Sequence, residues 1–414
     1  MSGAGSQEIR EQFPALGRMV GGRPVAFFDG PAGSQVPRMV IDAVCGYLSY
    51  HNANTHGTFA TSRETDETIE RARSRVAAFL GAKSPGEVAF GANMTTLTFA
   101  LSRALRLEWS PGDEVIVTEL DHQANVAPWR RAAEDAGAVV RMVRFDPESC
   151  TLDMAQLEGF IGPRTRLVAV GYSSNAVGTV NDVRRVASVA REAGALSFVD
   201  AVHFAPHGVI DVEEIGCDFL ACSAYKFFGP HLGILWGRRE LLDSGRPYKV
   251  PPASDRAPER WETGTLSHEG IAGAAAAVEW IGSLAGDQEA EWRERIVAGM
   301  ETIEGIERPL LDRLIDGLGS IPGVRLYGPP TGAARAPTVA LTVAGRSPVD
   351  VAGRLGEEGI FVWAGDFYAT TVIDRLGLRE SGGVVRIGLA PYNTAEEVDR
   401  LLDALARVAR SGRS

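Results

Sequence analysis

The chain has 414 residues, of which 45% are hydrophobic and 23% are charged, and its mean hydropathy is -0.04. This is the composition of an ordinary globular protein, and the length is sufficient for two domains with a substantial core. The formal net charge of -11 argues against nucleic acid or an anionic membrane as a partner, because both attract clustered basic side chains.

The N-terminal residues do not resemble a signal peptide, because no basic stretch precedes an apolar core. The most apolar window, residues 271–285, is interrupted by Glu279 and is rich in alanine and glycine, which suits a packed helix better than a membrane span. The cysteines are scattered without CxxC or Cys/His spacing. We therefore expect a cytoplasmic protein with no membrane association, no disulfide framework and no metal site.

Short apolar runs rich in β-branched residues alternate with helical stretches between about residues 87 and 237. Residues 181–193 are predicted to form an amphipathic helix, because Val183, Val186 and Val189 share one face. Strands are predicted at residues 115–118, 167–170, 195–199, 219–222 and 234–236. This alternation predicts an α/β fold in which helices cover both faces of a mostly parallel sheet. Ligands bind such sheets at the carboxyl ends of the strands.

The C-terminal part of the chain predicts a smaller α+β unit. Residues 251–260 are rich in proline and charge and are expected to form an exposed connection. Beyond them, strands are predicted at residues 337–344 and 384–389, and helices at residues 348–358 and 394–410. We predict a large domain of residues 27–290 and a small domain formed by residues 1–26 and 291–414.

Two side chains with chemical potential stand at the ends of predicted strands. Asp200 follows residues 195–199, and Lys226 lies just beyond residues 219–222. An acid and a lysine at the carboxyl ends of buried strands are what a pyridoxal 5'-phosphate enzyme requires. The lysine holds the cofactor aldehyde as a Schiff base, and the acid keeps the pyridine nitrogen protonated. A lone lysine would more simply be a surface residue, so the prediction depends on its companions.

Further segments accompany this pair. Residues 91–96 follow a strand and begin a helix, so their backbone N–H groups and threonine hydroxyls could hold a phosphate. The other segments are residues 27–37, 121–125, 175–179 and 385–394. Together with Asp200 and Lys226, they resemble the class V aminotransferase family. This family contains fold-type-I pyridoxal-phosphate enzymes such as cysteine desulfurases and selenocysteine lyases. The resemblance covers roughly residues 27–405 and implies a large domain with a mostly parallel, seven-stranded type of sheet.

The resemblance implies a role for individual residues. Lys226 would form the Schiff base, Asp200 would bind the pyridinium nitrogen, and His122 would stack on the cofactor ring. The remaining implied cofactor contacts are Met94, Thr95, Asn175, His203, Ser223, Tyr225 and Thr265. Of these, Thr265 corresponds to a threonine that reaches the phosphate of the neighbouring subunit, which implies a homodimer with shared active sites.

The predicted substrate is an amino acid that binds as a small molecule, and the sequence does not define what fills its side-chain pocket. Arg386 would pair with its α-carboxylate through two parallel hydrogen bonds, a geometry that lysine cannot supply. A structural arginine in an ion pair is the alternative reading of Arg386. The other residues predicted to contact the substrate are Asn54, His56 and Tyr368.

The departures from the family pattern concern sulfur chemistry. Tyr368 stands where cysteine desulfurases have a loop cysteine that accepts sulfur as a persulfide, and Trp363 replaces an arginine found in many relatives. Tyr225 and His203 are both similar to the kynureninase pattern. Residues 223–231 and 363–365 resemble the motifs of the cysteine desulfurase-like subgroup of the family.

Several reactions remain open for such a site. In each, the substrate would form an external aldimine and Lys226 would act as the general base at Cα. We predict a β-eliminating C–S lyase that acts on cysteine or a cysteine-derived substrate without a persulfide-forming cysteine. An aminotransferase, an epimerase, a kynureninase-like hydrolase and a cofactor-carrying binding protein without turnover are the alternatives.

Overall fold

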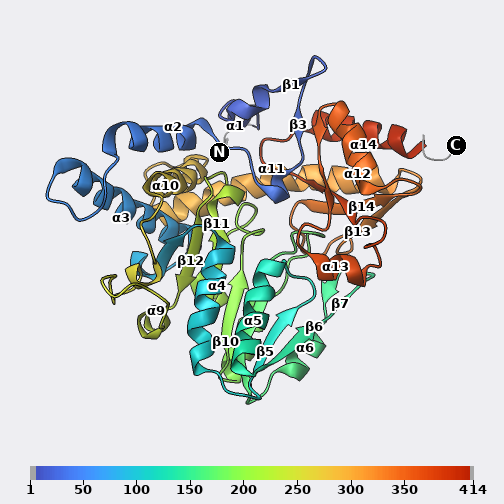
Figure 1. The fold of residues 1–414 in the computed structure, drawn as a ribbon. Coiled ribbons are helices and arrows are strands. Elements are labelled where there is room, and N and C mark those ends of the chain that lie inside the picture. Colours follow the sequence, from blue (N-terminus) through green and yellow to red (C-terminus); the bar gives the residue numbers. More distant parts are fainter. Residues whose placement is uncertain (1–5, 411–414) are drawn as a thin grey trace.

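The structure is a computed structural model, and it describes residues 6–410. Its main element is a seven-stranded sheet with helices on both sides, and a smaller sheet lies beside it (Figure 1). The strands of the large sheet, in spatial order, are β4 (Val88–Gly91), β12 (Gly233–Gly237), β11 (Phe219–Ser223), β10 (Leu196–Asp200), β9 (Thr165–Gly171), β5 (Glu114–Thr118) and β6 (Val139–Val143).

The pairings β6–β5–β9–β10–β11 are parallel, which confirms the predicted mostly parallel sheet. By contrast, β12 pairs antiparallel with both of its neighbours, β11 and β4. The chain between β11 and β12 is too short for the crossover helix that a parallel pairing would require. Every residue of β5, β11 and β12 is buried, as expected for strands that are covered on both faces.

The helices of the large sheet lie on two sides. Helix α7 (Val183–Glu192) confirms the predicted amphipathic helix and packs against β9 and β10. Helices α4 (Met94–Leu105) and α5 (Ala127–Ala136) belong to a separate apolar cluster on the opposite face. The others are α2 (Arg38–Gly46), α3 (Ala60–Leu80), α6 (Met154–Phe160), α8 (Val212–Ile215), α9 (Arg239–Ser244) and α10 (His268–Ser283).

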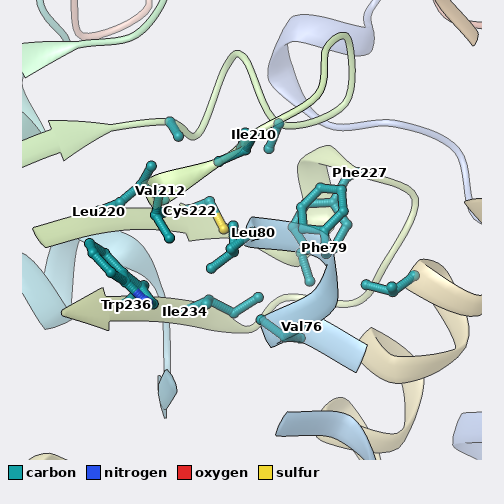
Figure 2. Close-up of a cluster of buried hydrophobic side chains, with 14 of the residues drawn as sticks. Val76, Phe79, Leu80, Ile210, Val212, Leu220, Cys222, Phe227, Ile234 and Trp236 are labelled. Atoms are coloured by element: carbon teal, nitrogen blue, oxygen red, sulfur yellow. The ribbon is translucent and has the colours of Figure 1, made fainter. Parts of the chain in front are cut away.

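The core on the α7 side is continuous from β11 and β12 to helix α3. Figure 2 shows side chains of α3, among them Phe79 and Leu80, beside residues of these strands such as Leu220 and Ile234. The sulfur of Cys222 points into the same cluster (Figure 2), and its side chain is fully buried. This cysteine is therefore a core residue.

The smaller unit is an antiparallel sheet with strands in the order β13 (Val324–Tyr327), β14 (Thr338–Val343), β17 (Val384–Gly388) and β16 (Trp363–Gly365). Its helices are α12 (Pro348–Glu357), α13 (Thr370–Arg375) and α14 (Ala395–Arg410). Strands β14 and β17 and helices α12 and α14 confirm the elements predicted for this part of the chain.

Helix α11 (Trp292–Gly319) connects the two units, because Ile296 and Ile303 belong to the large core and Leu314 belongs to the small one. The N-terminal helix α1 (Ser6–Arg10) also contacts both units. Ile9 packs in the large core, whereas Arg10 forms an ion pair with Glu397 of α14. The division into residues 27–290 and the remainder stays a prediction.

The remaining strands are two-residue pairs: β1 (Met19–Val20) with β2 (Arg23–Pro24), β3 (Ala26–Phe27) with β15 (Ile360–Phe361), and β7 (Phe145–Asp146) with β8 (Thr151–Leu152). Across residues 6–410, no helix combines the length and the apolar character that crossing a bilayer requires.

Candidate active site

A cavity of about 650 Å³ opens where the large sheet meets the small one. It lies at the carboxyl ends of β9, β10 and β11, which contribute Gly171, Asp200 and Ser223. The predicted site residues that line it are Met94, Thr95, His122, Asn175, Asp200, His203, Ser223, Tyr225, Lys226, Tyr368 and Arg386. Segments separated by almost 300 residues therefore meet in one place.

Lys226 ends a short 3-10 turn, Ala224–Lys226, that directly follows β11. The turn carries the side chain into the cavity, where the residue is 8% exposed. Its ammonium nitrogen contacts the carbonyl oxygen of Pro31. Within residues 6–410, no carboxylate oxygen lies within 4.0 Å of it. Burial, and secondarily the charge of Arg386, lowers the pKa of Lys226 to about 7.

This shifted pKa predicts how the lysine reacts with an aldehyde. Because the neutral amine is the nucleophile, the rate constant for covalent attachment of pyridoxal phosphate to the cofactor-free protein should rise as the pH passes through about 7. Stopped-flow absorbance over a pH series measures this rate, and the Lys226→Ala variant reports the background. A midpoint near the ordinary lysine value of 10.5 would contradict the assigned environment.

Asp200 is the last residue of β10 and is 7% exposed. Its Oδ1 accepts a hydrogen bond of 2.9 Å from the N–H of Val202. Burial raises the pKa of Asp200 to about 6, and the nearby charge of Lys226 partly offsets this. A buried carboxyl group of this kind is stabilised by a cationic N–H donor, which a protonated pyridine nitrogen would provide.

Two histidines face the cavity as neutral rings. Burial lowers the pKa of His122 to about 4, with smaller contributions from the charges of Lys226 and Arg386. Because Nδ1 of His122 accepts a hydrogen bond of 3.0 Å from the N–H of Ala124, its proton resides on Nε2. His203 is buried, which holds its pKa well below the usual range, and its Nε2 lies 3.0 Å from the hydroxyl of Thr338.

The N-terminus of the 12-residue helix α4 forms another part of the cavity wall. Asn93 caps this helix by accepting a hydrogen bond from the N–H of Thr96 at 2.9 Å. The backbone N–H of Met94 donates to Ser223 Oγ at 3.0 Å, which fixes the helix end against β11. Thr95 is exposed toward the cavity. Backbone donors and hydroxyls at a helix N-terminus suit a phosphate.

Arg386 lies on β17 and is 3% exposed. One Nη1–H donates to the backbone oxygen of Asn175 at 2.8 Å, and the guanidinium carbon lies 3.9 Å from the centre of the Phe367 ring. Nε has no hydrogen-bond partner among residues 6–410, and the guanidinium forms no ion pair within 4.0 Å there. Burial lowers its pKa to about 9. A buried cation without a carboxylate partner is suited to bind one from a ligand.

The segment that contains Tyr368 is fixed to residues that follow β5 and β9 of the large sheet. Phe367 and Tyr368 adopt consecutive left-handed conformations, with φ of 55° and 57°. Asn175 Nδ2 donates to the carbonyl of Phe367 at 3.0 Å, and the N–H of Gln123 donates to the carbonyl of Tyr368 at 2.8 Å. The centroid of the Tyr368 ring lies 5.5 Å from the centroid of the His122 ring. Residues other than glycine rarely adopt a left-handed backbone conformation unless their surroundings enforce it. The two hydrogen bonds to this segment enforce it here.

Asp121 and Gln123 are among the cavity-lining residues for which the sequence predicted no role. Asp121 lines the cavity and is held by hydrogen bonds from the N–H of Gly171 at 2.8 Å and from Asn125 Nδ2 at 2.9 Å. Gln123 contacts the segment around Tyr368 a second time, through a hydrogen bond of 2.9 Å from Nε2 to Thr370 Oγ1. Both lie in the segment 121–125, in which only His122 received a role. Their position next to His122 in the sequence was the signal that could have identified them as site residues.

Three predicted site residues do not line the cavity of this chain. Asn54 and Thr265 are exposed, and the side chain of His56 is 84% exposed, with its ring nitrogen 3.5 Å from Asp66. Their assigned contacts with substrate or with the cofactor phosphate stay predictions.

The residues present fit pyridoxal phosphate. The cavity holds an amine and a carboxyl group, both buried and outside any ion pair within 4.0 Å in the described chain. It also contains a capped helix end beside a serine hydroxyl. These are the partners for an aldehyde, a pyridine nitrogen and a phosphate, respectively.

Comparisons with known proteins agree with this chemistry. A sequence model of the family described as aminotransferase class-V matches residues 26–401. A cysteine desulfurase from Pectobacterium carotovorum subsp. carotovorum is 32% identical over 419 residues, covering 98% of each chain. A probable cysteine desulfurase from Mycolicibacterium paratuberculosis is 33% identical, and the match covers 98% of this chain but 58% of that protein.

Solved structures show the same fold. A cysteine desulfurase from Thermococcus onnurineus NA1 superimposes with a TM-score of 0.88 at 29% identity and 98% coverage of both chains. The cysteine desulfurase CsdA from Escherichia coli gives 0.85 at 28% identity and 99% coverage of both chains. The chain therefore belongs to the class V aminotransferase family of fold-type-I enzymes and is a pyridoxal-phosphate-dependent enzyme with cysteine desulfurase-like relatives.

Proposed function

We propose that the protein is a C–S β-lyase that cleaves cysteine or a cysteine-derived substrate and releases the sulfur as sulfide or a small thiol. The observation that carries the proposal is the replacement of the loop cysteine by Tyr368 on a segment that is fixed to residues that follow β5 and β9 of the large sheet. The relatives described as cysteine desulfurases support a reaction in which cysteine or a related amino acid is the substrate.

The cofactor, when bound, withdraws electrons from the substrate Cα and so makes its proton acidic. Arg386 holds the α-carboxylate and fixes which bond at Cα faces Lys226. The Nζ atom of Lys226, whose lowered pKa keeps much of it neutral near pH 7, accepts the Cα proton. Asp200 would hold the pyridine nitrogen in its protonated form, and His122, as a neutral ring, would add no charge beside it.

The overall reaction is a hydrolytic elimination. The Cα–H bond and the Cβ–S bond break, and the electron pair of the latter leaves with sulfur, which takes up a proton. The released 2-aminoacrylate reacts with water to give pyruvate and ammonium. A cysteine thioether and one water thus yield one thiol, one pyruvate and one ammonium ion, with no oxidant or reductant.

The cysteines support release of free sulfur rather than transfer to the protein. Cys217 and Cys222 are fully buried, which raises the pKa of both thiols, and burial raises the pKa of Cys150 to about 11. Cys45 is exposed but lies on α2, and none of the four residues lines the cavity within the described chain. A persulfide carrier requires an accessible thiolate next to the substrate sulfur.

The test is a variant in which all four cysteines are replaced by serine or alanine. We expect its turnover, measured as pyruvate and as sulfide or thiol, to stay within about tenfold of the parent, because no thiol takes part. A loss of about a thousandfold, traced to one cysteine and accompanied by a persulfide on that residue in mass spectra, would restore the desulfurase reading. Keto acid formed only with a second keto acid present would indicate a transaminase instead.

The proposal includes a cytoplasmic homodimer in which Thr265 serves the partner's site. Glu262, three residues earlier, is anchored by a bidentate ion pair with Arg73 at 2.7 Å, and both side chains are buried. This pair holds the short segment that carries the exposed Thr265 at the surface of its own chain. A hydroxyl held there could contact a phosphate in a second copy.

Mixed dimers test this arrangement. Thr265→Ala alone should weaken cofactor binding by about tenfold or more, since a hydrogen bond to an ionised group is lost. Combining Thr265→Ala chains with Lys226→Ala chains creates one site in which both residues are intact. Cofactor titration should then show recovery of parental affinity in half of the sites. Absence of that recovery in verified mixed dimers, or a monomer with full cofactor occupancy, would rule out sharing.

A further inference from the structure

Apolar and aromatic side chains from several elements line part of the cavity. Phe99 of α4 and Ala127 of α5 contribute from the large domain. Trp363 and Tyr368 contribute from the small sheet and the segment that follows it, and they are 49% and 71% exposed. Side chains of this kind at a cavity mouth provide a surface for an apolar ligand group.

The position of this surface follows from the strand pairing. Trp363 on β16 is the cross-strand partner of Arg386 on β17, and the ring of Phe367 lies against the Arg386 guanidinium. A ligand whose carboxylate is held by Arg386 therefore has aromatic groups immediately beside it. The two hydrogen bonds from Asn175 and Gln123 hold the backbone of Phe367 and Tyr368 in place.

The charges of the cavity restrict the ligand further. Among the described residues that line it, the lysine and arginine side chains are Lys226 and Arg386. Lys226 is assigned to the cofactor and Arg386 to the α-carboxylate. His122 and His203 are neutral because burial lowers their pKa values. A second carboxylate on the ligand would thus find no further cation among the described residues that line the cavity.

We propose that the site selects amino acids with a single carboxylate and an apolar side chain, so that its substrates are S-alkyl or S-aryl conjugates of cysteine rather than free cysteine or acidic conjugates. The substrate class rests on the proposed C–S lyase function, whereas the binding preference does not. Cleavage of such a conjugate follows the balance given above, and the leaving group is an alkyl or aryl thiol.

Binding of amino acids that cannot eliminate separates the preference from turnover. L-Homophenylalanine and L-2-aminoadipate have a methylene in place of sulfur and match S-phenylcysteine and S-carboxymethylcysteine, respectively. Calorimetric titration of the holoenzyme should give at least about tenfold tighter binding of homophenylalanine, because its ring is buried and the second carboxylate is not compensated. Equal affinities, or tighter binding of 2-aminoadipate, would overturn the inference.

A charge placed in the apolar wall should change this preference. Ala127→Lys introduces a cation at the start of α5, and we expect the ratio of the two dissociation constants to fall at least about tenfold. Ala136→Lys, on the same helix but outside the cavity, is the matched control and should leave the ratio unchanged. An equal change in the ratio of the two dissociation constants in both variants would contradict the assignment of the start of α5 to the apolar wall of the cavity.

Turnover then distinguishes the two proposals. Pyruvate formation with higher kcat/KM from S-benzylcysteine than from cysteine or S-carboxymethylcysteine supports both. A higher kcat/KM for cysteine overturns the substrate class while leaving the C–S lyase intact. If the binding preference is observed but none of the three substrates yields pyruvate, the lyase proposal is contradicted and the apolar pocket is supported.

Discussion

Replacing Lys226 with alanine is expected to lower turnover by at least about a thousandfold and to remove the covalent link to the cofactor. The loss is large because one side chain supplies both the attachment point and the base that accepts the Cα proton. The chain has three lysines, and Lys83 and Lys249 form ion pairs with Glu213 and Asp255 away from the cavity. Borohydride reduction followed by peptide mass spectrometry measures the link directly.

The control is Lys249→Ala, which should keep the reducible link and near-parental turnover. Because Lys226 is a buried amine without an ion pair, its removal should not lower the free energy of unfolding. A reducible adduct that persists in Lys226→Ala, on a protein of unchanged fold, would show that the wrong lysine has been assigned.

The chemistry of the site could be predicted because it depends on local signals. Asp200 and Lys226 follow runs of buried β-branched and apolar residues, and the carboxyl ends of parallel strands meet at one edge of a sheet. The helix that begins at Met94 was expected from the strand and turn before it. For these residues, position in the sequence determines position in the fold.

Other features depend on contacts that no local pattern records. Gln123 bonds to Tyr368 and Thr370, about 245 residues away, and the left-handed conformation of Tyr368 follows from such contacts rather than from its residue type. The reversed direction of β12 likewise reflects a short connection rather than a composition, since its apolar run is like that of β11, which pairs in parallel with β10. Sequence periodicity identifies a strand but not its direction.

The exposed positions of Asn54, His56 and Thr265 illustrate a further limit. The family resemblance implied that Thr265 contacts a neighbouring subunit, and contacts between subunits leave no pattern in the local sequence. The mixed-dimer experiment addresses Thr265 directly.

Replacing Arg386 with glutamine is expected to weaken substrate binding and, at the same time, to leave the folded protein as stable as the parent or more so. A carboxylate held by two charged hydrogen bonds contributes about 1.5–3 kcal/mol per bond, so we expect kcat/KM to fall by about a hundredfold or more. Arg386→Lys keeps the charge but not the paired geometry, and it should recover only part of the loss.

The stability of these variants distinguishes a ligand-binding arginine from a structural one. Arg386 is a buried cation with no carboxylate oxygen within 4.0 Å in the described chain. The charge of Asp29 only partly offsets the effect of burial, which lowers the pKa of Arg386, so the guanidinium charge costs free energy in the absence of ligand. Glutamine can still donate toward the Asn175 carbonyl but carries no charge. Urea unfolding of the ligand-free protein should therefore show an unchanged or higher midpoint for Arg386→Gln. As a control, Arg379→Gln removes an exposed pair with Asp374 and should change neither kcat/KM nor the midpoint appreciably. A clear loss of stability in Arg386→Gln with little change in kcat/KM would mean that the arginine holds the fold together rather than the substrate.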